Sequence, residues 1–480
     1  MQSFIGREKE LFALHGLSSL QVACLVVIRG RRRIGKSRLV QEFAKDYKLL
    51  SFAGLAPIKG VKAQDQRNNF ARQITTNCGV PPVQFADWSD AFAFLTERIN
   101  DQPTIILFDE ISWMGAKDPT FVPKLKNWWD MALQNYPRVI LVLCGSVSTW
   151  ITKNIIKSTA FFGRISLSLN LHELSLPESY QLLRNKGFSG SIYDVIKLLS
   201  ITGGVPWYLE QIRPNQTADD NIKNLCFDSN GNLIDEFDKI FHDLFKTKGE
   251  IYKKIIVLLA DGMQPLTKIR SDMGFAKSGS LSKYMQDLIV SGFVTEHYTW
   301  SIKTGKISKN KIYRLSDCYL RFYIKYIEPN LLKIKQDAFK DIAISTLPGW
   351  NSIFGFQVES LLLKNRFLLQ KNIGIHPTDI LADNPYIQNP TTRHKGCQID
   401  YLIQSHSHNL FACEFKFSRR EIGIQVIEQM QEKIKRLSTP HGYGICPVLV
   451  HMGDVAGGVY SKNYFYRIID IINLLETGGQ

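Results

Sequence analysis

A glycine-rich loop between a buried strand and a helix constrains the fold of this chain more than any other feature. The apolar run at 22–28 predicts a buried strand, and Leu39, Val40 and Phe43 follow it at helical spacing. Between them the sequence reads G-x-x-x-x-G-K-S, in the strand–loop–helix setting that a phosphate-binding loop requires. The loop and its flank comprise Gly30, Arg31, Arg32, Arg33, Ile34, Gly35, Lys36, Ser37 and Arg38. A basic turn before a surface helix is the alternative interpretation.

The loop also predicts how a nucleotide is held. Its glycines allow backbone N–H groups to point at a polyphosphate, and the helix adds the positive end of its dipole. We expect Lys36 to reach the β- and γ-phosphates and Ser37 to ligate Mg²⁺. ATP and Mg²⁺ are therefore the predicted cofactors of this site.

A second apolar strand begins at Thr104 and ends in two acids, Asp109 and Glu110. Carboxylates at the carboxyl end of a parallel strand lie at the mouth of a nucleotide site. We expect Asp109 to hold the hydrated Mg²⁺ and Glu110 to polarise the attacking water. The alternative is that these acids cap the next helix after a core strand.

Ser146 and Arg164 are further candidates for the nucleotide site. Ser146 ends the buried strand that begins at Arg138, where it either senses the γ-phosphate or caps the following helix. Arg164 follows Gly163 directly before another strand. There it either stabilises charge on the transferred phosphoryl group or forms a surface ion pair, and we favour the first role.

Together these motifs resemble the archaeal-type ATPase family of the STAND/AAA+ superfamily, over residues 3–235. The match extends to T-G-G-V-P-W-Y-L at 202–209, which resembles a turn in that family's helical lid. The resemblance implies that Pro206 begins a lid helix near the nucleotide and that an N-terminal segment covers the adenine. That segment contains Phe4, Ile5, Gly6 and Arg7. An ordinary helix start is the alternative for it.

Net charge and cysteine content indicate which partners and which cellular compartment to expect. The chain has 480 residues, more than one core usually serves, and its net charge of +15 favours a polyanionic partner such as DNA. Its eight cysteines form no C-x-x-C pair, so free thiols in a reducing compartment are expected. Neither a signal peptide nor a membrane-spanning run is recognised, which predicts a cytoplasmic protein without a membrane partner.

Residues 236–345 predict a DNA-binding module. Helical patterns at 250–259, 265–273 and 278–291 precede two short strands, which indicates a winged helix-turn-helix, as the resemblance also implies. Between Lys303 and Lys340, ten Lys and Arg stand against three Asp and Glu. The candidates for DNA contact in the third helix are Ser278, Ser280, Ser282 and Lys283. The alternative is a lid that packs on the ATPase and never meets DNA.

The last part of the chain carries two acids and a lysine on adjacent predicted strands. Asp400 lies on one strand, and Glu414 and Lys416 project from one face of the next because they are two residues apart. Such a group is a candidate site for Mg²⁺ or Mn²⁺ and a bound water. It resembles the PD-(D/E)xK nuclease fold, with Glu359 as a further acid on an upstream helix. A solvated cross-strand charge pair is the alternative.

The sequence thus predicts an α/β protein with three domains. These are a P-loop AAA+/STAND ATPase with a helical lid (1–235), a winged helix-turn-helix (236–345) and a restriction-endonuclease-like domain (346–480). The predicted function is ATP binding and hydrolysis by a DNA-associated protein whose nucleotide state controls a C-terminal Mg²⁺-dependent nuclease. The alternative is a nucleotide-dependent switch or scaffold whose nuclease-like domain binds nucleic acid or protein without cutting. A homo-oligomer is compatible with both.

The expected roles divide between two sites. The expected catalytic residues are Glu110, Arg164, Glu359, Asp400, Glu414 and Lys416. The expected metal ligands are Ser37, Asp109, Glu359, Asp400 and Glu414.

Overall fold

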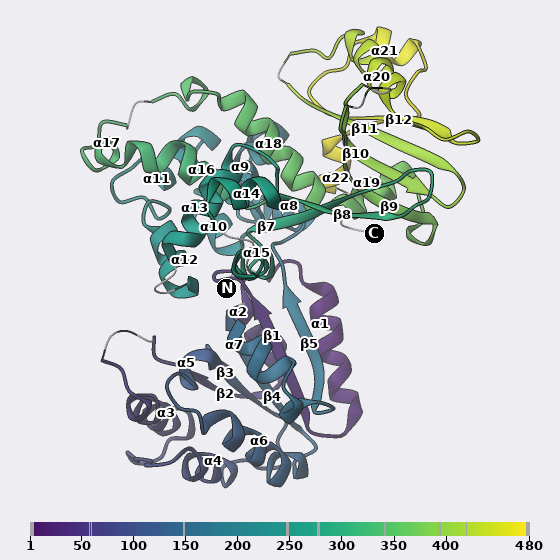
Figure 1. Ribbon diagram of the computed structural model, residues 1–480. Coiled ribbons are helices and arrows are strands. Elements are labelled where there is room, and N and C mark those ends of the chain that lie inside the picture. Colours follow the sequence, from purple (N-terminus) through teal and green to yellow (C-terminus); the bar gives the residue numbers. More distant parts are fainter. Residues whose placement is uncertain are drawn as a thin grey trace. The chain divides into compact units, whose positions relative to one another are not determined.

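A computed structural model describes residues 4–56, 58, 60–146, 149–245, 249–275, 279–339, 342–390, 392, 395–418 and 420–476. The chain forms two compact units, Met1–Glu173 and Leu174–Gln480 (Figure 1). The lid helices, which the sequence analysis joins to the ATPase core, belong to the second unit. The domain boundaries at 235 and 345 remain predictions.

The first unit is built on a five-stranded parallel sheet with the strand order β2-β3-β4-β1-β5 (Figure 1). Its strands are β1 (Cys24–Gly30), β2 (Lys48–Ala53), β3 (Thr104–Asp109), β4 (Val139–Ser146) and β5 (Ile165–Leu171). The central strands are continuous apolar runs because helices cover both faces of the sheet. The predicted α/β class with a parallel sheet is therefore confirmed.

Alternate residues of β1 show how the two faces are covered. Val26 and Ile28 pack with α1 (Glu8–His15) and α2 (Lys36–Phe43). Leu25 and Val27 pack with the larger helices of the opposite face. Those helices are α3 (Ala63–Cys78), α4 (Trp88–Thr96) and α6 (Phe121–Met131), with the short α5 (Ile111–Met114) and α7 (Thr149–Ile151) nearby. The carboxyl ends of the strands, including the turn from β1 to α2, form one edge of this unit.

The second unit begins with the helices that the sequence analysis assigns to the lid. They are α8 (Leu176–Asn185), α9 (Ile192–Thr202), α10 (Pro206–Glu210) and α11 (Ala218–Cys226). The next helix, α12 (Glu236–Phe245), lies in the range predicted for the winged module. Ser175 and Ser191 cap α8 and α9 through reciprocal hydrogen bonds with an acid three residues later. Pro206 is the first residue of α10, as predicted, where a missing N–H costs nothing.

The three predicted helices and the hairpin of the winged module are present. They are α13 (Gly249–Ala260), α14 (Leu266–Asp272), α15 (Ser280–Val290), β7 (Val294–Trp300) and β8 (Ile307–Leu315). A short strand, β6 (Gln264–Pro265), pairs with β8 and completes a three-stranded sheet. Ser278, a predicted DNA contact, lies outside the described residues. Trp300 and Ile302 are buried in the hydrophobic cluster of the next sheet, so the hairpin packs on the C-terminal domain.

The C-terminal domain is a five-stranded sheet with the order β13-β12-β11-β10-β9. Its strands are β9 (Ile380–Gln388), β10 (Cys397–Ser405), β11 (Asn409–Phe417), β12 (Gly444–Met452) and β13 (Arg467–Asp470). The pairs β9–β10 and β10–β11 are antiparallel, whereas the pairs β11–β12 and β12–β13 are parallel.

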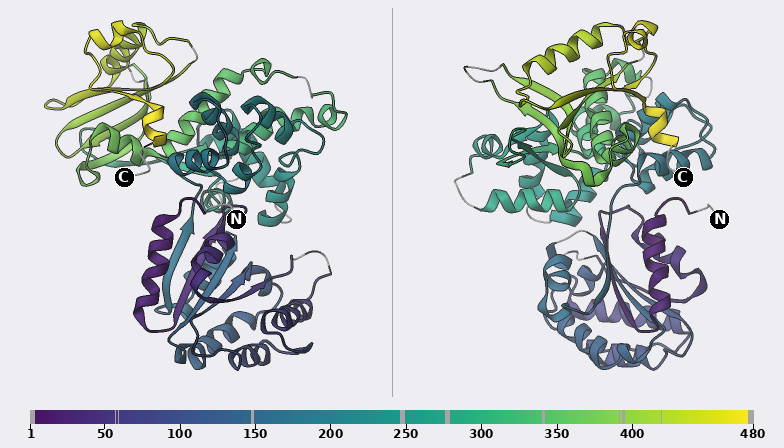
Figure 2. Two further views of the ribbon diagram at one scale, coloured as in Figure 1. Left: turned by 180° about the vertical axis from the view of Figure 1, so that it is seen from behind. Right: turned by 90° about the vertical axis from the view of Figure 1, so that its right-hand side faces the viewer.

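Helices cover both faces of this sheet (Figure 2). One face packs on α18 (Trp350–Lys364), α19 (Arg366–Ile373) and α22 (Ile471–Glu476), and the other on α20 (Gln425–Arg436) and α21 (Gly457–Ser461). The short helices α16 (Cys318–Phe322) and α17 (Leu331–Lys335) connect this domain to the winged module. In the described ranges, none of the helices combines the length and apolar character that crossing a bilayer needs.

Candidate functional site

The turn from β1 to α2 depends on its two glycines. A Cβ at Gly30 would lie 2.8 Å from the carbonyl oxygen of Leu171 and 2.9 Å from Cγ2 of Ile34. Gly35 has a φ of 89°, a left-handed conformation that glycine adopts readily. Ile34, between them, is fully buried and anchors the loop to the core. Backbone and core together fix the shape of the loop.

Lys36 directs its ammonium into this loop. The side chain is almost fully buried, and Nζ donates to the carbonyl oxygens of Gly30 at 3.1 Å and Arg31 at 3.2 Å. Both acceptors are neutral, and a charged phosphate oxygen forms a stronger hydrogen bond with an ammonium. The loop therefore holds a buried cation that an anionic ligand can pair with.

The two predicted Mg²⁺ ligands of the nucleotide site are in contact. Ser37 Oγ donates to Asp109 Oδ2 at 2.5 Å, although the residues are far apart in the chain. The contact forms because α2 begins beside the carboxyl end of β3. Mg²⁺ in nucleotide sites is held by one or two carboxylates or hydroxyls, water and phosphate oxygens. The donor set of Ser37 and Asp109 fits such an ion.

Glu110 has an unusual backbone conformation at the end of β3. Its φ of 50° places a non-glycine residue in the left-handed region, which typically costs about 1–3 kcal/mol. Its carboxylate accepts hydrogen bonds from Ser146 Oγ at 3.1 Å and Ser146 N at 3.3 Å. Ser146 thus orients the Glu110 carboxylate. For Ser146 itself, the two predicted roles of γ-phosphate sensor and helix cap both remain predictions.

Two of the arginines predicted to bind nucleotide are engaged in anchoring the loop. Arg31 forms an ion pair with Glu173 at 2.9 Å, just after β5. Arg7 is buried with a φ of 64°, and its guanidinium donates to the carbonyl oxygens of His172 and, at 3.3 Å, Ile34. These contacts join the N-terminal segment, the loop and the end of β5.

The other predicted nucleotide contacts lie in different surroundings. Phe4, Ile5, Gly6, Arg32 and Arg33 are partly buried in the first unit, and Arg38 is exposed. Pro206 belongs to the second unit, so its predicted role near the nucleotide remains a prediction.

Arg164 does not lie at the phosphate loop of its own chain. It directly precedes β5, which pairs in parallel with β1 from Leu25 to Gly30. Arg164 is therefore at the amino edge of the sheet, roughly 20 Å from the loop at about 3.3 Å per residue. Its guanidinium pairs with Asp130 through Nε–Oδ1 at 2.6 Å and an η nitrogen–Oδ2 at 2.9 Å. Hydrogen bonds from Arg164 lower the pKa of Asp130 to about 2.

This position limits one expectation from the sequence. The structure shows the ion pair of Arg164 and places the arginine far from the phosphate loop of its own chain, so a contact with the transferred phosphoryl group stays a prediction for a second copy of the chain. The reason is strand direction, because a residue that precedes a parallel strand lies at the edge opposite the nucleotide.

The structure brings Asp400, Glu414 and Lys416 together. Between Ile399 and Leu402, β10 has one residue more than β9, and such a bulge redirects the side chain of Asp400. Asp400 Oδ2 accepts a hydrogen bond from the backbone N–H of Phe415 at 2.9 Å. Glu414 is buried, and its Oε1 lies 2.9 Å from Lys416 Nζ. Burial raises the pKa of Asp400, and the charge of Glu414 raises it further.

A second lysine, which the sequence analysis misses, completes this group. Lys433 on α20 forms an ion pair with Glu414 Oε2, and its Nζ lies 3.9 Å from Asp400 Oδ1. A buried Glu414 beside a partly buried Asp400 needs positive charge, and Lys433 supplies part of it. Helical spacing could have predicted the position of Lys433. Val426, Met430 and Lys433 share one face of α20, and the first two are buried against the sheet.

Glu359, the predicted upstream acid of this site, forms an ion pair, and its role as a metal ligand remains a prediction. Its Oε1 accepts a hydrogen bond from a guanidinium N–H of Arg314 on β8 at 2.9 Å. Arg314 is buried and needs a counter-charge, which Glu359 provides. Within the described residues, no group of three or more His, Cys, Asp or Glu is placed to hold a metal ion. The donor set of the C-terminal site is therefore two carboxylates, which matches Mg²⁺ with several waters.

Comparisons with known proteins agree with the first of these sites. Residues 4–212 match the family described as an ATPase domain predominantly from Archaea. An uncharacterized protein of Methanocaldococcus jannaschii, MJECL04, is 26% identical over 378 residues, which cover 77% of this chain and 78% of that protein.

Similar solved structures include the Walker-type ATPase PABY2304 of Pyrococcus abyssi and the Aeropyrum pernix ORC2 protein in ADPNP–ADP complexes. The first has a TM-score of 0.49 at 15% identity and covers 67% of this chain and 96% of that one. The second has a TM-score of 0.42 at 14% identity and covers 70% and 97%. TM-scores below 0.5 do not establish a common fold for the whole chain. Residues 4–212, by the family match, form an archaeal-type ATPase domain.

Proposed function

We propose that this chain hydrolyses ATP at the phosphate loop and cuts DNA at the C-terminal acid pair, and that the nucleotide state controls the cutting. The observation that carries the second half is the convergence of Asp400, Glu414, Lys416 and Lys433 on one face of the C-terminal sheet. The archaeal-type ATPase domain supports the first half.

At the ATP site, each residue has a role that follows from its position. Lys36 pairs with the β- and γ-phosphates, and Ser37 and Asp109 hold Mg²⁺. Bound Mg²⁺ neutralises charge on the phosphate oxygens. Glu110, oriented by Ser146, polarises the attacking water.

The remaining predicted contacts belong to the same proposal. Adenine is covered by Phe4, Ile5 and Gly6, and the loop arginines and Pro206 surround the nucleotide. Arg164 acts on the nucleotide of a second copy of the chain, because it does not reach its own loop.

At the acid pair, Asp400 and Glu414 are the proposed ligands of a divalent cation. Such a cation supplies a bound water of lowered pKa. Lys416 orients that water or stabilises charge on the phosphate under attack. Lys433 compensates the charge of the two acids and so keeps them in contact within an apolar sheet.

DNA is the proposed polyanionic partner. Lys303, Lys306, Lys309 and Lys311 are exposed on or beside the β7–β8 hairpin, whose other face is buried. On α15, Ser282 and Lys283 are exposed while Leu281 and Tyr284 face the core. Basic and polar side chains are therefore available where a winged helix contacts DNA.

A second function, a nucleotide-dependent switch or scaffold, is favoured by a different observation. Lys433 lies between both acids, and Glu359 is paired with Arg314. A closed network of ion pairs of this kind also serves a purely structural purpose. In that case the C-terminal domain binds nucleic acid or protein and cuts nothing.

DNA cleavage by the full-length chain separates the two functions. We expect the wild type to nick or cut plasmid DNA with Mg²⁺ or Mn²⁺. The Asp400→Ala variant is expected to lose at least about 100-fold of this rate, because it loses a metal ligand. Its ATP hydrolysis should stay unchanged, since that site lies in the other unit.

Asp454→Ala is the matched control, because Asp454 is an exposed acid in the same domain. It should cut DNA like the wild type. Intact DNA with every metal and nucleotide, from a protein that hydrolyses ATP, would overturn the nuclease proposal and leave the switch.

A further inference from the structure

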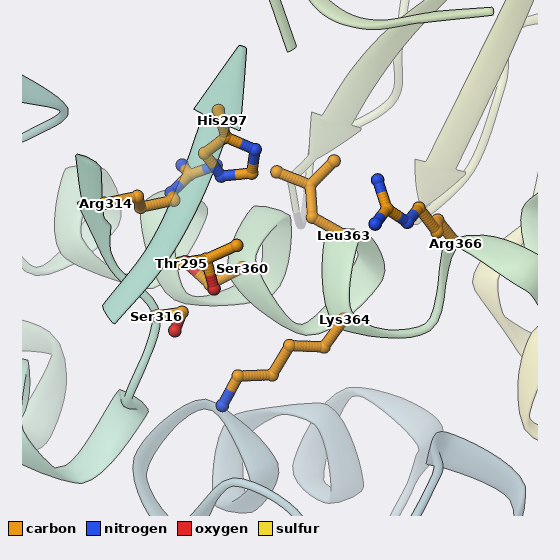
Figure 3. A pocket seen from close by; sticks show the side chains of 8 residues that line it. All are labelled: Thr295, His297, Arg314, Ser316, Ser360, Leu363, Lys364 and Arg366. Carbon is orange, nitrogen blue, oxygen red and sulfur yellow. The ribbon is translucent and has the colours of Figure 1, made fainter. Parts of the chain in front are cut away.

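A cavity of about 160 Å³ lies between the β7–β8 hairpin and the junction of α18 and α19 (Figure 3). Its walls include Thr295, His297, Arg314, Ser360, Lys364 and Arg366. None of these residues belongs to the phosphate loop or to the acid pair. The cavity is therefore a separate feature of the second unit.

Three of the eight lining residues carry cationic side chains. Arg314 pairs with Glu359 at 2.9 Å, Arg366 pairs with Asp383 at 3.2 Å, and Lys364 is a third cation. Figure 3 shows the guanidinium of Arg314 beside the imidazole of His297, with Arg366 on the far side of Leu363. The walls also carry hydroxyl groups. Such a cavity suits a small anion with several oxygen atoms.

Two buried polar atoms in the wall have no hydrogen-bond partner. His297 and Arg314 are only 5% and 2% exposed, yet His297 Nε2 and Arg314 Nε are unpaired. Leaving a buried polar atom unpaired is costly, so native proteins rarely do so without a reason. A ligand that pairs with both atoms removes this cost.

The two atoms require different partners. His297 Nδ1 lies 2.9 Å from Asn384 Oδ1, an acceptor, so Nδ1 carries the proton in this arrangement. Burial lowers the pKa of His297 to about 4, so the ring is neutral near pH 7 and Nε2 is an acceptor. Arg314 Nε is a donor. The matching ligand is therefore an anion that also carries a hydroxyl.

We propose that this cavity binds the hydrogen phosphate ion, that is, free inorganic phosphate, which keeps one P–OH group at neutral pH. Its anionic oxygens accept hydrogen bonds from Arg314 and Arg366, and its P–OH group donates to His297 Nε2. Sulfate has the same size and shape but no hydroxyl near neutral pH. It leaves Nε2 unpaired, so the site discriminates between the two anions.

Calorimetry on the full-length chain tests this proposal with inorganic phosphate, glycerol phosphate and sulfate. A Lys36→Ala background weakens phosphate binding at the loop and so isolates the cavity. We expect inorganic phosphate to bind at least about tenfold more tightly than sulfate, because an unpaired buried acceptor penalises sulfate. Glycerol phosphate, a monoester with a second pKa of about 6, has mostly lost its P–OH proton at neutral pH and should bind as weakly as sulfate. Binding of glycerol phosphate as tight as that of inorganic phosphate would contradict the role given to the hydroxyl.

Two variants assign the binding to the cavity. Arg366→Gln, at a half-exposed position that folding tolerates, should weaken phosphate binding roughly tenfold, whereas Arg467→Gln, an exposed arginine on β13, should not. His297→Leu should remove the preference for phosphate over sulfate. Equal affinity for both anions, no saturable binding, or no effect of Arg366→Gln would each overturn the proposal, and the last holds even if His297→Leu fails to fold.

Discussion

Glu110 combines a strained backbone with a side chain held in place by Ser146. Strain of this kind persists where surrounding contacts over-determine a residue, and it is concentrated at functional sites. Its neighbour Asp109 contacts Ser37 across the mouth of the loop. Four residues, from the ends of β3 and β4 and the start of α2, therefore form two hydrogen-bonded pairs beside the loop.

Two substitutions test this convergence. Lys36→Ala should abolish ATP hydrolysis and weaken ATP binding, because it removes the cation inside the loop. Glu110→Gln should keep ATP binding and slow hydrolysis by roughly 10²–10⁴-fold, the usual contribution of a group that activates water. Phosphate release and nucleotide affinity are the two measurements.

The controls are Lys45→Ala and Glu97→Gln, which change exposed residues of the same unit. Both should hydrolyse ATP at the wild-type rate. Full activity in Lys36→Ala and Glu110→Gln would remove the ATPase assignment from this loop.

Residues joined by local spacing were predictable from the sequence, and residues joined by tertiary packing were not. The pair Glu414 and Lys416 follows from the period of a strand, and Asp109 follows from its place after an apolar run. Lys433 reaches the same acids from a helix that follows them in the chain. Its role depends on how α20 crosses the sheet, which periodicity alone does not define.

At the scale of elements, the β7–β8 hairpin has two distinct faces. Trp300 is buried, and its indole N–H donates to Gln404 Oε1 on β10 at 2.5 Å. Gln404 in turn donates to the carbonyl oxygen of Ile302 at 2.9 Å. One face of the hairpin therefore belongs to the C-terminal core, and the lysines lie on what remains exposed.

The exposed lysines of the hairpin should govern the salt dependence of DNA binding. If about six phosphates are neutralised, affinity falls by roughly 10³ between about 50 and 200 mM salt. Alanine at Lys303, Lys306, Lys309 and Lys311 should lower the slope of log affinity against log salt by about one for each lysine that contacts a phosphate. Fluorescence anisotropy at several salt concentrations measures this slope.

Four exposed lysines elsewhere in the second unit provide the control. They are Lys371, Lys395, Lys435 and Lys462, which lie outside the basic stretch 303–340. Alanine at these positions should leave the slope near its wild-type value. A hairpin variant with an unchanged slope would exclude the hairpin from the DNA interface.

The helices and strands were predictable from the sequence, whereas the position of Arg164 depended on the direction of one strand, β5. The helices of the winged module and the strands of the first unit have clear periods and clear turn residues. Arg164 was assigned to the nucleotide because it precedes a strand after a glycine. Since β5 is parallel to β1, that position is the wrong edge of the sheet for contact with the loop of the same chain.

At the scale of the whole molecule, the two candidate sites lie in different compact units. The phosphate loop belongs to residues 1–173 and the acid pair to residues 174–480. The lid helices, the winged module and the C-terminal domain share one continuous hydrophobic core. If the bound nucleotide controls DNA cutting, a change in the first unit must therefore alter the second unit, which contains the acid pair.

Coupling between two sites is reciprocal, which gives the last prediction two independent measurements. If ATP changes DNA binding by a given factor, DNA must change ATP binding by the same factor, typically about 5–150-fold. We expect this factor in Glu110→Gln, which holds ATP without turning it over. In Lys36→Ala, DNA cleavage should continue at its basal rate. It should no longer respond to ATP, because this variant binds ATP weakly. If DNA leaves the ATP affinity of Glu110→Gln unchanged and ATP leaves wild-type cleavage unchanged, the two units work independently. The nuclease and the ATPase would then share a chain without sharing control.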